Sequence, residues 1–347
     1  TLFEGETLLP PGTLRTSSGV PYSVFTPFKR AFLDIAQIAR PLAAPAHLPA
    51  VPVDVRADNA RIPSCEELGI TPNDRVLEPG ERAARRRLET FASSSLRSYD
   101  RARDMLADEA GTSRLSQDLK FGTVSARAVW HAASGDGRGA EVFRNELVWR
   151  EFTHSTLWDR PDVLEHSFRR DFEGFPWRHD DAGWQAWVDG RTGFPVVDAA
   201  ARQLLATGFV HNRARMVAAS FLTKHLAIDY RRGEAHYLRW LTDGDWAQNN
   251  FNWQWSAGSG CDAQPYFRVF NPRLQGEKFD PDGDYVRRWV PELARMPAKW
   301  IHSPSAAPGD VLERAGVAIG RDYPAPIVKH ADARERFLEL ARNHLRK

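Results

Sequence analysis

The chain has 347 residues, of which 42% are hydrophobic and 27% charged, with a net charge of +2 at pH 7. This ordinary globular composition excludes a disordered or collagen-like chain, and no apolar run approaches the ~20 residues that cross a bilayer, which excludes an integral membrane protein. The two cysteines, Cys65 and Cys261, are too few for a disulfide framework or a four-cysteine metal site, and they suit a reducing, cytoplasmic setting.

Residues 1–75 are predicted to form an irregular connector with one helix. That helix covers 25–39, with Pro27 in its first turn. A Pro- and Ala-rich stretch over 41–52 follows and is typical of an extended linker.

From residue 76 onward, apolar residues recur at helical spacing and prolines separate the segments. The pattern predicts helices over 81–107, 125–133, 140–157, 184–188, 196–207, 211–230, 232–242, 284–289 and 334–346. Strand-like alternation is nearly absent, and the sequence has no internal repeat and no dinucleotide-type glycine motif. We therefore expect a mostly α protein, with one large helical domain over 76–347 after the connector.

Arginine and tryptophan are both used unusually. Of the 47 basic residues, forty are Arg and seven are Lys. Arg suits bidentate contact with phosphate, although a bias in genome base composition explains the same excess. Four of the twelve Trp fall within residues 240–255, beside polar residues, and such a cluster favours stacking on a planar ligand over core packing alone.

The first polar segment, Gly111–Ser116, combines a glycine with hydroxyl side chains and Arg114. Backbone N–H groups, hydroxyls and the start of a following helix suit an anion. A plain helix N-cap is the alternative interpretation.

Two further segments place unlike polar groups on one helix face. Glu146, Trp149 and Arg150 share a helix face by their i, i+3, i+4 spacing. This face is either part of a site or an exposed face with an intrahelical ion pair.

Asn212, Arg215 and Met216 share a face of a second helix. Their side chains suit a flat heteroaromatic partner, and a solvated N-terminal turn is the alternative.

The fourth segment, Asp243–Trp255, holds seven polar side chains among three Trp. If it is helical, Asp245, Asn249 and Trp253 form an i, i+4, i+8 stripe, and this polarity is hard to explain as core. A calcium loop is the alternative for Asp243–Asp245, but the bidentate Glu twelve positions on is missing. We predict no metal site.

Taken together and in this order, these segments resemble the DNA photolyase/cryptochrome family. The stretches PYSVFTPF (21–28), TGFPVVDAA (192–200) and DAQPYFRVFNP (262–272) support the same resemblance, which runs from near residue 8 to about residue 330. It implies an all-helical FAD-binding domain. The family's α/β antenna domain is expected to be absent before residue 1, and only that domain would carry an antenna chromophore, a folate or a deazaflavin.

The resemblance also implies which residues hold FAD. Those matching positions around the FAD phosphates and sugar are Tyr99, Thr112, Ser113, Arg114, Leu115 and Ser116. Asp243, Gly244 and Asp245 match the segment bonded to the flavin and its sugars, and Asn249 matches the residue facing the reactive ring nitrogen. Arg150 and Arg215 match basic residues beside the isoalloxazine, with Arg215 paired to Asp243.

For the substrate, the resemblance implies a pyrimidine dimer flipped out of DNA. Glu146 matches the carboxyl group that hydrogen-bonds the thymine carbonyl, and Trp149 and Trp255 match the indoles that wall the pocket. The further matched lesion and DNA contacts are Asn212, Met216, Arg103, Arg213 and Gln275.

The activity implied is a carbon–carbon lyase reaction, in which light-excited reduced FAD donates an electron to a cyclobutane pyrimidine dimer and the ring splits. Asn212 after His211 resembles the dimer-repairing, class I-like branch rather than six-four photolyases or animal cryptochromes. A blue-light receptor of cryptochrome type without repair activity is the alternative, and a flavin-free Arg-rich DNA-binding module is a second one. We expect a monomer.

One departure from the family concerns electron relay to the flavin, which normally follows three Trp. Trp253 and Trp177 match the inner and outer positions, but Tyr230 stands at the middle one. Tyrosine is harder to oxidise unless it also loses a proton. We therefore expect photoreduction to be slowed or to use another aromatic residue, for example Trp240.

Overall fold

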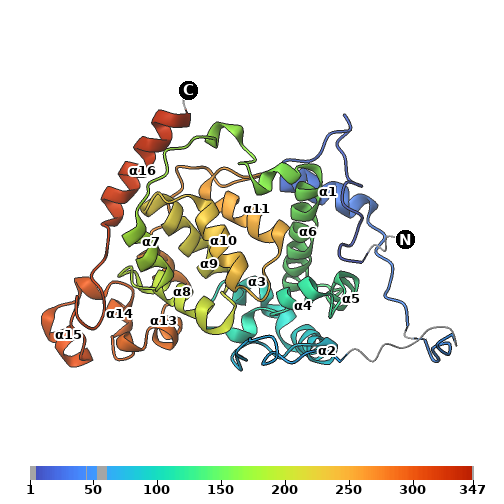
Figure 1. Cartoon of the computed structure of the whole chain (residues 1–347), viewed down its shortest axis with the longest axis horizontal. Coiled ribbons are helices and arrows are strands. Elements are labelled where there is room, and N and C mark those ends of the chain that lie inside the picture. Colours follow the sequence, from blue (N-terminus) through green and yellow to red (C-terminus); the bar gives the residue numbers. More distant parts are fainter. Residues whose placement is uncertain (1–4, 44, 53–60, 346–347) are drawn as a thin grey trace.

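The computed structural model describes residues 5–43, 45–52 and 61–345. Within these ranges the secondary structure is helical, without a named strand, apart from an isolated bridge between Ile319 and Tyr323. The expectation of a mostly α fold is confirmed (Figure 1). No helix of the described ranges is both long enough and apolar enough to cross a membrane.

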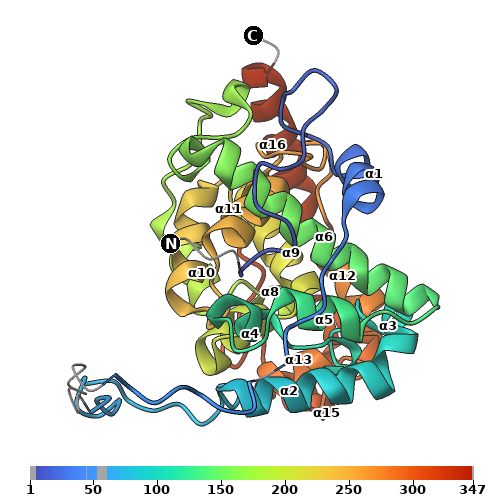
Figure 2. The ribbon, with the colours of Figure 1, turned by 90° about the vertical axis from the view of Figure 1, so that its right-hand side faces the viewer.

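The connector contributes one helix, α1 (Phe25–Ile35), which packs on α6 (Arg138–Asp159). Its buried stripe consists of Phe25, Phe28 and Phe32, and burial of these rings against the core stabilises the helix. The predicted helix over 25–39 ends four residues early, because the backbone turns extended at Ala36. Residues 45–52 and 61–75 extend away from the helical body, and the chain rejoins it at α2 (Glu81–Thr90), as Figure 2 shows.

The single helix predicted over 81–107 is wrong. After α2 come a π-helical turn η1 (Phe91–Ser95), a 3-10 turn η2 (Leu96–Ser98) and the short α3 (Tyr99–Ala102). The hydroxyls of Ser93 and Ser94 donate to main-chain carbonyls of the preceding turn, which competes with regular helix bonding. α6 also approaches so closely at Gly139 that a Cβ there would meet the carbonyl oxygen of Leu96.

The helix predicted over 211–230 is also interrupted. α9 (Asn212–Ser220) passes into the π-helical turn η6 (Phe221–His225), and α10 (Tyr230–Trp240) begins separately. Ala227 has a positive φ of 54° and the Asp229 side chain caps α10, so the chain changes direction between them. Tyr230 is therefore the first residue of α10 rather than the last residue of a long helix.

The remaining helices follow in chain order with mostly short connections. They are α4 (Ser116–Phe121), α5 (Ala126–Ala132), α7 (Asp181–Val188), α8 (Pro195–Thr207), α11 (Trp246–Ala257), α12 (Pro272–Phe279), α13 (Asp284–Trp289), α14 (Ala298–Ile301), α15 (Gly309–Ala315) and α16 (His330–Leu345). The 3-10 turns are η3 (Glu109–Gly111), η4 (Pro161–Leu164), η5 (Arg170–Phe172), η7 (Pro291–Leu293) and η8 (Pro304–Ala306).

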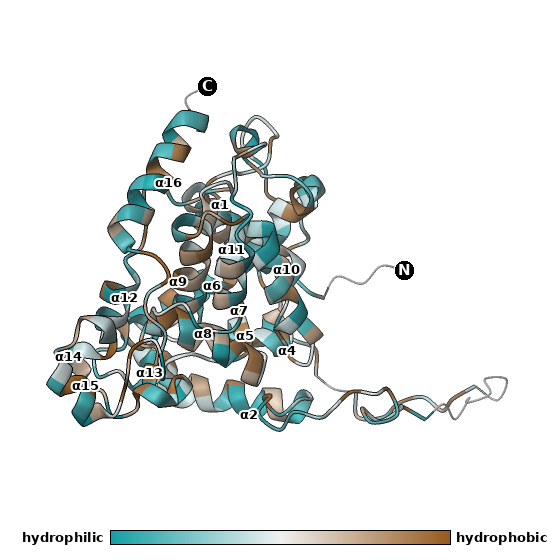
Figure 3. Cartoon of the chain, turned by 60° about the vertical axis from the view of Figure 1, so that its left-hand side comes forward, coloured by the Kyte–Doolittle hydropathy of each residue, from teal (hydrophilic) through white to brown (hydrophobic). Residues whose placement is uncertain are grey.

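Two large apolar cores organise these helices. One core joins α8, α9, α10 and α13, and the other joins α1, α2, α5 and α6. The hydropathy colouring in Figure 3 shows brown segments on the central helices, whereas α16 is largely hydrophilic. α11 belongs to both cores, since Trp253 packs in the first and Phe251 in the second. The functional side chains lie at this junction.

Candidate functional site: a cavity between the two cores

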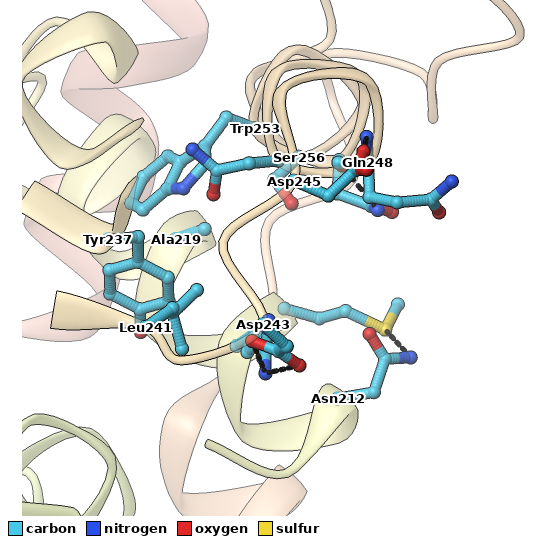
Figure 4. A pocket seen from close by; sticks show the side chains of 13 residues that line it. Asn212, Ala219, Tyr237, Leu241, Asp243, Asp245, Gln248, Trp253 and Ser256 are labelled. Carbon is cyan, nitrogen blue, oxygen red and sulfur yellow. Dashed lines mark hydrogen bonds and ion pairs between the residues drawn. The ribbon is translucent and has the colours of Figure 1, made fainter. Parts of the chain in front are cut away.

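Two adjoining hollows lie where the two cores meet. The inner cavity, of about 70 Å³, is bounded by α9, α10 and α11 (Figure 4), and the outer cleft, of about 270 Å³, extends from α3 and the 112–116 loop to α6. The residues that line both are Asn212, Arg215, Asp243, Asp245, Gln248 and Asn252. One continuous space therefore joins all four polar segments that the sequence singled out.

The first turn of α9 presents Asn212, Arg215 and Met216 to this space, as the helical spacing predicted. Arg215 donates through Nε to the Val210 carbonyl at 2.7 Å and through Nη2 to both carboxylate oxygens of Asp243 at 3.0 and 2.8 Å. The predicted pairing of Arg215 with Asp243 is thus confirmed. Asn212 is exposed and its amide N–H donates to the Met216 sulfur at 3.9 Å, which holds the two side chains together and leaves the Asn212 Oδ1 available for a ligand.

The predicted stripe of Asp245, Asn249 and Trp253 is present on α11, and all three line the inner cavity. Asp245 caps the helix, since its Oδ1 accepts from the Gln248 backbone N–H at 2.8 Å. Just before it, the Gly244 carbonyl accepts from the Lys120 ammonium group. The Asp243–Asp245 segment is therefore fixed from both sides, and the sequence did not point to Lys120.

Asn249 is buried and its orientation is set by α10. Its Nδ2 donates to the Glu234 carbonyl at 2.9 Å, which leaves Oδ1 available as an acceptor. The Glu234 side chain in turn accepts from Asn250 at 3.0 Å, and burial raises the pKa of Glu234 to about 7. Two neighbouring amides on α11 are thus held by a single residue of α10.

The 112–116 loop turns sharply at Arg114, whose φ is 53°. This left-handed conformation is uncommon for a residue with a Cβ and places the guanidinium 3.9 Å from the centre of the Phe209 ring. Burial lowers the pKa of Arg114, and its buried Nε has no hydrogen-bond partner in the described ranges. Thr112, Ser113, Leu115 and Ser116 line the same cleft.

Arg150 enters the cleft from α6 and binds the start of the connector. Its Nη1 donates to the Glu6 carbonyl at 2.7 Å, while its buried Nη2 makes no hydrogen bond among the described residues. His154, one turn later, lies 3.8 Å from Asp245 and 3.9 Å from the Glu6 carboxylate. Nothing in the sequence connected Glu6 with this site.

Glu146 and Arg103 form an ion pair at the cleft wall, with Arg103 Nη1 2.5 Å from Glu146 Oε1. The guanidinium also lies 5.4 Å from the centre of the Tyr99 ring, and Tyr99 lines the cleft as well. The sequence placed Glu146 in a face with Trp149 and Arg150 but did not link it to Arg103.

The remaining predicted substrate contacts lie outside the two hollows. Trp149 and Trp255 are half-buried and pack against the α1–α6 core, where Trp149 stacks on Phe25 with ring centres 3.6 Å apart. Arg213 binds Asp104 at 2.8 Å and lies over the Phe279 ring at 4.4 Å. Gln275, on α12, is partly exposed and is not among the residues lining either hollow; the position of α12 was not predicted.

Comparison with known proteins identifies the family. A family model described as the FAD binding domain of DNA photolyase matches residues 143–343, more than half of the chain. The chain belongs to the DNA photolyase family. The photolyases named deoxyribodipyrimidine photo-lyase from Agrobacterium fabrum and Escherichia coli are 46% and 42% identical, each over 97% of this chain and over 72% and 71% of their own lengths.

Solved photolyase and cryptochrome structures share the fold. A bacterial class III photolyase from Agrobacterium tumefaciens is 42% identical with a TM-score of 0.89, covering 99% of this chain and 73% of that one. A Synechocystis cryptochrome is 30% identical with a TM-score of 0.85, covering 97% and 72%. The class I-like assignment stays a prediction.

The cleft of this photolyase fits FAD. Arg114 Nε has no hydrogen-bond partner in the described ranges, and Arg150 Nη2 has only the Glu6 carboxylate 3.5 Å away; both groups belong to residues lining the outer cleft, and buried donors of this kind require an acceptor. A diphosphate supplies such acceptors, while the uncharged side chains of Asn249, Tyr237 and Trp253 at the inner cavity suit a flat ring system. Phe209, Lys120 and Tyr237 were missed by the sequence because no local pattern marks them.

The predicted relay residues are not arranged as one line of touching rings. Tyr230 and Trp177 are neighbours, with ring centres 6.5 Å apart. Trp253, however, rests against Gly233, and its aromatic neighbours in the described ranges are Trp187 and Tyr237. Trp240, the other aromatic residue suggested by the sequence, has His236 as its aromatic neighbour there.

Proposed function

We propose that this chain is a light-dependent DNA-repair photolyase that splits cyclobutane pyrimidine dimers. The observation that carries the proposal is the single space in which α9, α11, α6 and the 112–116 loop bring together a cofactor-type cleft and Glu146, Asn212 and Met216. The relatives that match nearly the whole chain are named deoxyribodipyrimidine photo-lyase, which supports a repair enzyme.

FAD, when bound in its reduced form and excited by blue light, supplies the electron that initiates splitting of the dimer. Arg114, Arg150 and the loop hydroxyls would hold its diphosphate region. Arg215, held by Asp243, and Asp245 would orient the flavin end, and the free Oδ1 of Asn249 would accept a hydrogen bond from the ring. These polar groups are positioned by their own partners before any ligand binds, which lowers the cost of ordering on binding.

Bases stacked inside a duplex cannot come close to the cofactor. The dimer therefore reaches this space only when it is flipped out of the duplex. Trp149 and Trp255 lie outside the two hollows and Trp149 already stacks on Phe25, so their proposed stacking on the flipped bases requires the remaining ring faces. Such stacking is expected to contribute ~1–3 kcal/mol per base. Asn212 and Met216 contact the dimer, and Glu146, when protonated, hydrogen-bonds the thymine carbonyl where negative charge develops. Arg103, Arg213 and Gln275 bind the DNA backbone.

We further propose that residues 1–75 form a connector and 76–347 the catalytic domain, that the protein works as a monomer, and that any antenna chromophore, a folate or a deazaflavin, binds outside this chain. The Arg150–Glu6 contact supports a connector that also closes the cofactor cleft.

A dimer-reversal assay tests the function. The purified, reduced holoprotein is incubated with UV-irradiated oligothymidine in blue light and in darkness, and intact thymines are measured by recovery of absorbance. Light-dependent recovery is expected, and Asn212→Ala should reduce it. Absence of recovery from flavin-loaded protein contradicts the proposal and favours a cryptochrome-type receptor. This is the second candidate function, because the chain is also similar to the Synechocystis cryptochrome.

A further inference from the structure

The indole of Trp149, on α6, is stacked on a ring from the connector. The Phe25 ring lies almost parallel to it, with ring centres 3.6 Å apart and an interplanar angle of 7°. Aromatic pairs in proteins prefer offset or edge-to-face arrangements with ring centres about 4.5–7 Å apart, so a face-to-face pair this close needs support from its surroundings. One face of the Trp149 indole is therefore covered by the protein itself.

Two further rings support the Phe25–Trp149 pair. Phe152, on the same helix as Trp149, lies edge-on to the indole, with ring centres 5.9 Å apart and an angle of 61°. Phe251, on α11, does the same with ring centres 6.1 Å apart and an angle of 64°. All three phenylalanines are buried, whereas Trp149 is half-buried. The plane of the indole is thus set by three rings, and part of its surface stays open.

Phe25 is itself held by a residue 237 positions further along the chain. Its backbone N–H donates to Asp262 Oδ2 at 3.1 Å. Phe25 is the first residue of α1, and the preceding Val24 has no polar side chain that could cap this N–H. Asp262 therefore caps α1 from a distant loop, and an acidic side chain also suits the positive end of a helix.

The loop that carries Asp262 is shaped for this contact. Asp262 has a φ of 47°, a left-handed conformation that Asp and Asn adopt more readily than other residues with a Cβ. The preceding residue, Cys261, is buried, and its thiol donates to the Ser23 carbonyl at 3.2 Å. Two consecutive residues of the loop after α11 thus bind the start of α1.

We propose that Phe25 is a positioning residue for recognition of the dimer: its ring, anchored by Asp262, fixes the plane of Trp149 so that the open part of the indole meets a flipped base. The inference rests on the proposed function in one respect, the stacking of Trp149 on the lesion. No residue of α1 was among the predicted site residues, so the connector enters the site only through this contact and that of Glu6 with Arg150.

Fixing the indole before the base arrives strengthens binding because the cost of ordering the side chain is met in the free protein. That cost corresponds to roughly a threefold to tenfold change in affinity for one side chain. The gain applies only to a base that leaves the duplex and stacks on Trp149, and bases that remain stacked inside an undamaged duplex do not receive it. Loss of the Phe25 ring should therefore lower selectivity for the dimer rather than general affinity for DNA.

Binding of the FAD-loaded full chain to duplexes with and without one thymine dimer tests this assignment. Phe25→Leu should weaken binding to the dimer-containing duplex by about threefold to tenfold, and leave binding to the undamaged duplex and the flavin content unchanged. Phe25→Tyr keeps the ring and should bind like the wild type. Phe32→Leu is the matched control, because it removes a buried ring of the same helix that packs against Trp130 on α5.

A double-mutant cycle separates this role from a general effect on folding. If Phe25 acts through the indole, Phe25→Leu should cause no further loss of dimer affinity once Trp149 is replaced by Ala. The rate of dimer reversal at saturating DNA should stay within about twofold of the wild type, which is a small change in barrier, because Phe25 orders the binding site and takes no part in the chemical step.

Asp262→Gly gives a second variant that leaves the phenylalanine core intact, so it tests the proposal even if Phe25→Leu does not fold. It removes the hydrogen bond to the Phe25 N–H, and glycine adopts the positive φ without strain. A selective loss of dimer affinity is expected here as well.

Three results overturn the proposal: equal losses in Phe25→Leu and Phe32→Leu, equal weakening on damaged and undamaged DNA, or a full effect of Phe25→Leu in the Trp149→Ala background. Any of these with a dimer-selective wild type contradicts only this inference. A wild type that does not prefer dimer-containing DNA contradicts the proposed function and this inference with it.

Discussion

The guanidinium of Arg103 is bonded to the carboxylate of Glu146, 2.5 Å away, at the wall of the outer cleft. Each of these side chains has a different proposed partner in the DNA complex, a phosphate for Arg103 and the thymine carbonyl for Glu146. The DNA phosphate must therefore replace Glu146 as the partner of Arg103, and that exchange frees the Glu146 carboxyl group to face the thymine carbonyl.

Replacing Arg103 by Gln should weaken binding to dimer-containing DNA and reduce its salt dependence. The plot of log K against log salt concentration has a negative slope, and loss of one phosphate contact makes that slope less steep by about 0.9. The measurement is a titration of labelled, UV-irradiated duplex at several salt concentrations. Arg314→Gln removes an exposed arginine paired within α15 and is the control; an equal effect in both variants would show that Arg103 makes no specific phosphate contact.

Replacing Glu146 by Gln should slow repair without a comparable loss of flavin. The amide still donates to the thymine carbonyl, but it is a weaker donor than a protonated carboxyl group, and a bond weaker by ~1 kcal/mol corresponds to about a fivefold decrease. The rate of dimer reversal under saturating DNA measures it. An unchanged rate would remove Glu146 from the chemical step.

Replacing Asp243 by Asn should release FAD. Asp243 is 8% exposed and both of its oxygens accept from Arg215, so the variant leaves a partly buried guanidinium without its counter-charge. We expect FAD affinity to fall by at least about tenfold, or ~1.4 kcal/mol. Flavin absorbance per protein after gel filtration reports this, with Asp310→Asn, from an exposed pair, as control.

Replacing Trp253 by Phe should abolish photoreduction of the flavin, because the relay predicted from the family begins at this ring. The test is bleaching of the oxidised flavin band in blue light with a thiol present. Normal bleaching in the variant would show that another residue is the first donor, and it would remove the basis for the predicted relay.

Glu151 should make stability depend on pH. Burial raises its pKa from 4.5 to about 7, although the Leu8 and Leu9 backbone N–H groups donate to it. A raised carboxyl pKa contributes stability that is fully present below pH 4.5 and is lost as the pH rises through about 7. Over the whole range from pH 4.5 to about 7, the loss is roughly 3–4 kcal/mol at ~1.4 kcal/mol per pH unit.

Urea unfolding of the wild type and of Glu151→Gln at pH 5.5 and 8.5 measures this effect. The Gln side-chain oxygen still accepts from the two N–H groups, so the variant should show a smaller decrease in the free energy of unfolding between these pH values. Glu141→Gln, on the exposed face of α6, is the control. Equal pH dependence in all three proteins would contradict the assignment.

Local spacing was enough to predict the helical class and the faces that enter the site. The i, i+3, i+4 pattern put Asn212, Arg215 and Met216 on one side of α9, and the stripe of α11 appeared as expected, since side-chain direction follows directly from helix geometry. The same reasoning failed at 81–107, where serine hydroxyls and the close approach of α6 at Gly139 change the helix type.

The sequence by itself determined which residues of this protein share a helix face, because that depends on neighbours three and four positions apart. Only the tertiary structure decided which faces meet: Arg103 with Glu146, Arg150 with Glu6, and Trp253 with Trp187 rather than Tyr230. These pairs are 43 or more residues apart along the chain, and packing of the two cores around α11 brings them together. No local pattern encodes such a contact, so no inspection of the sequence alone could have placed them.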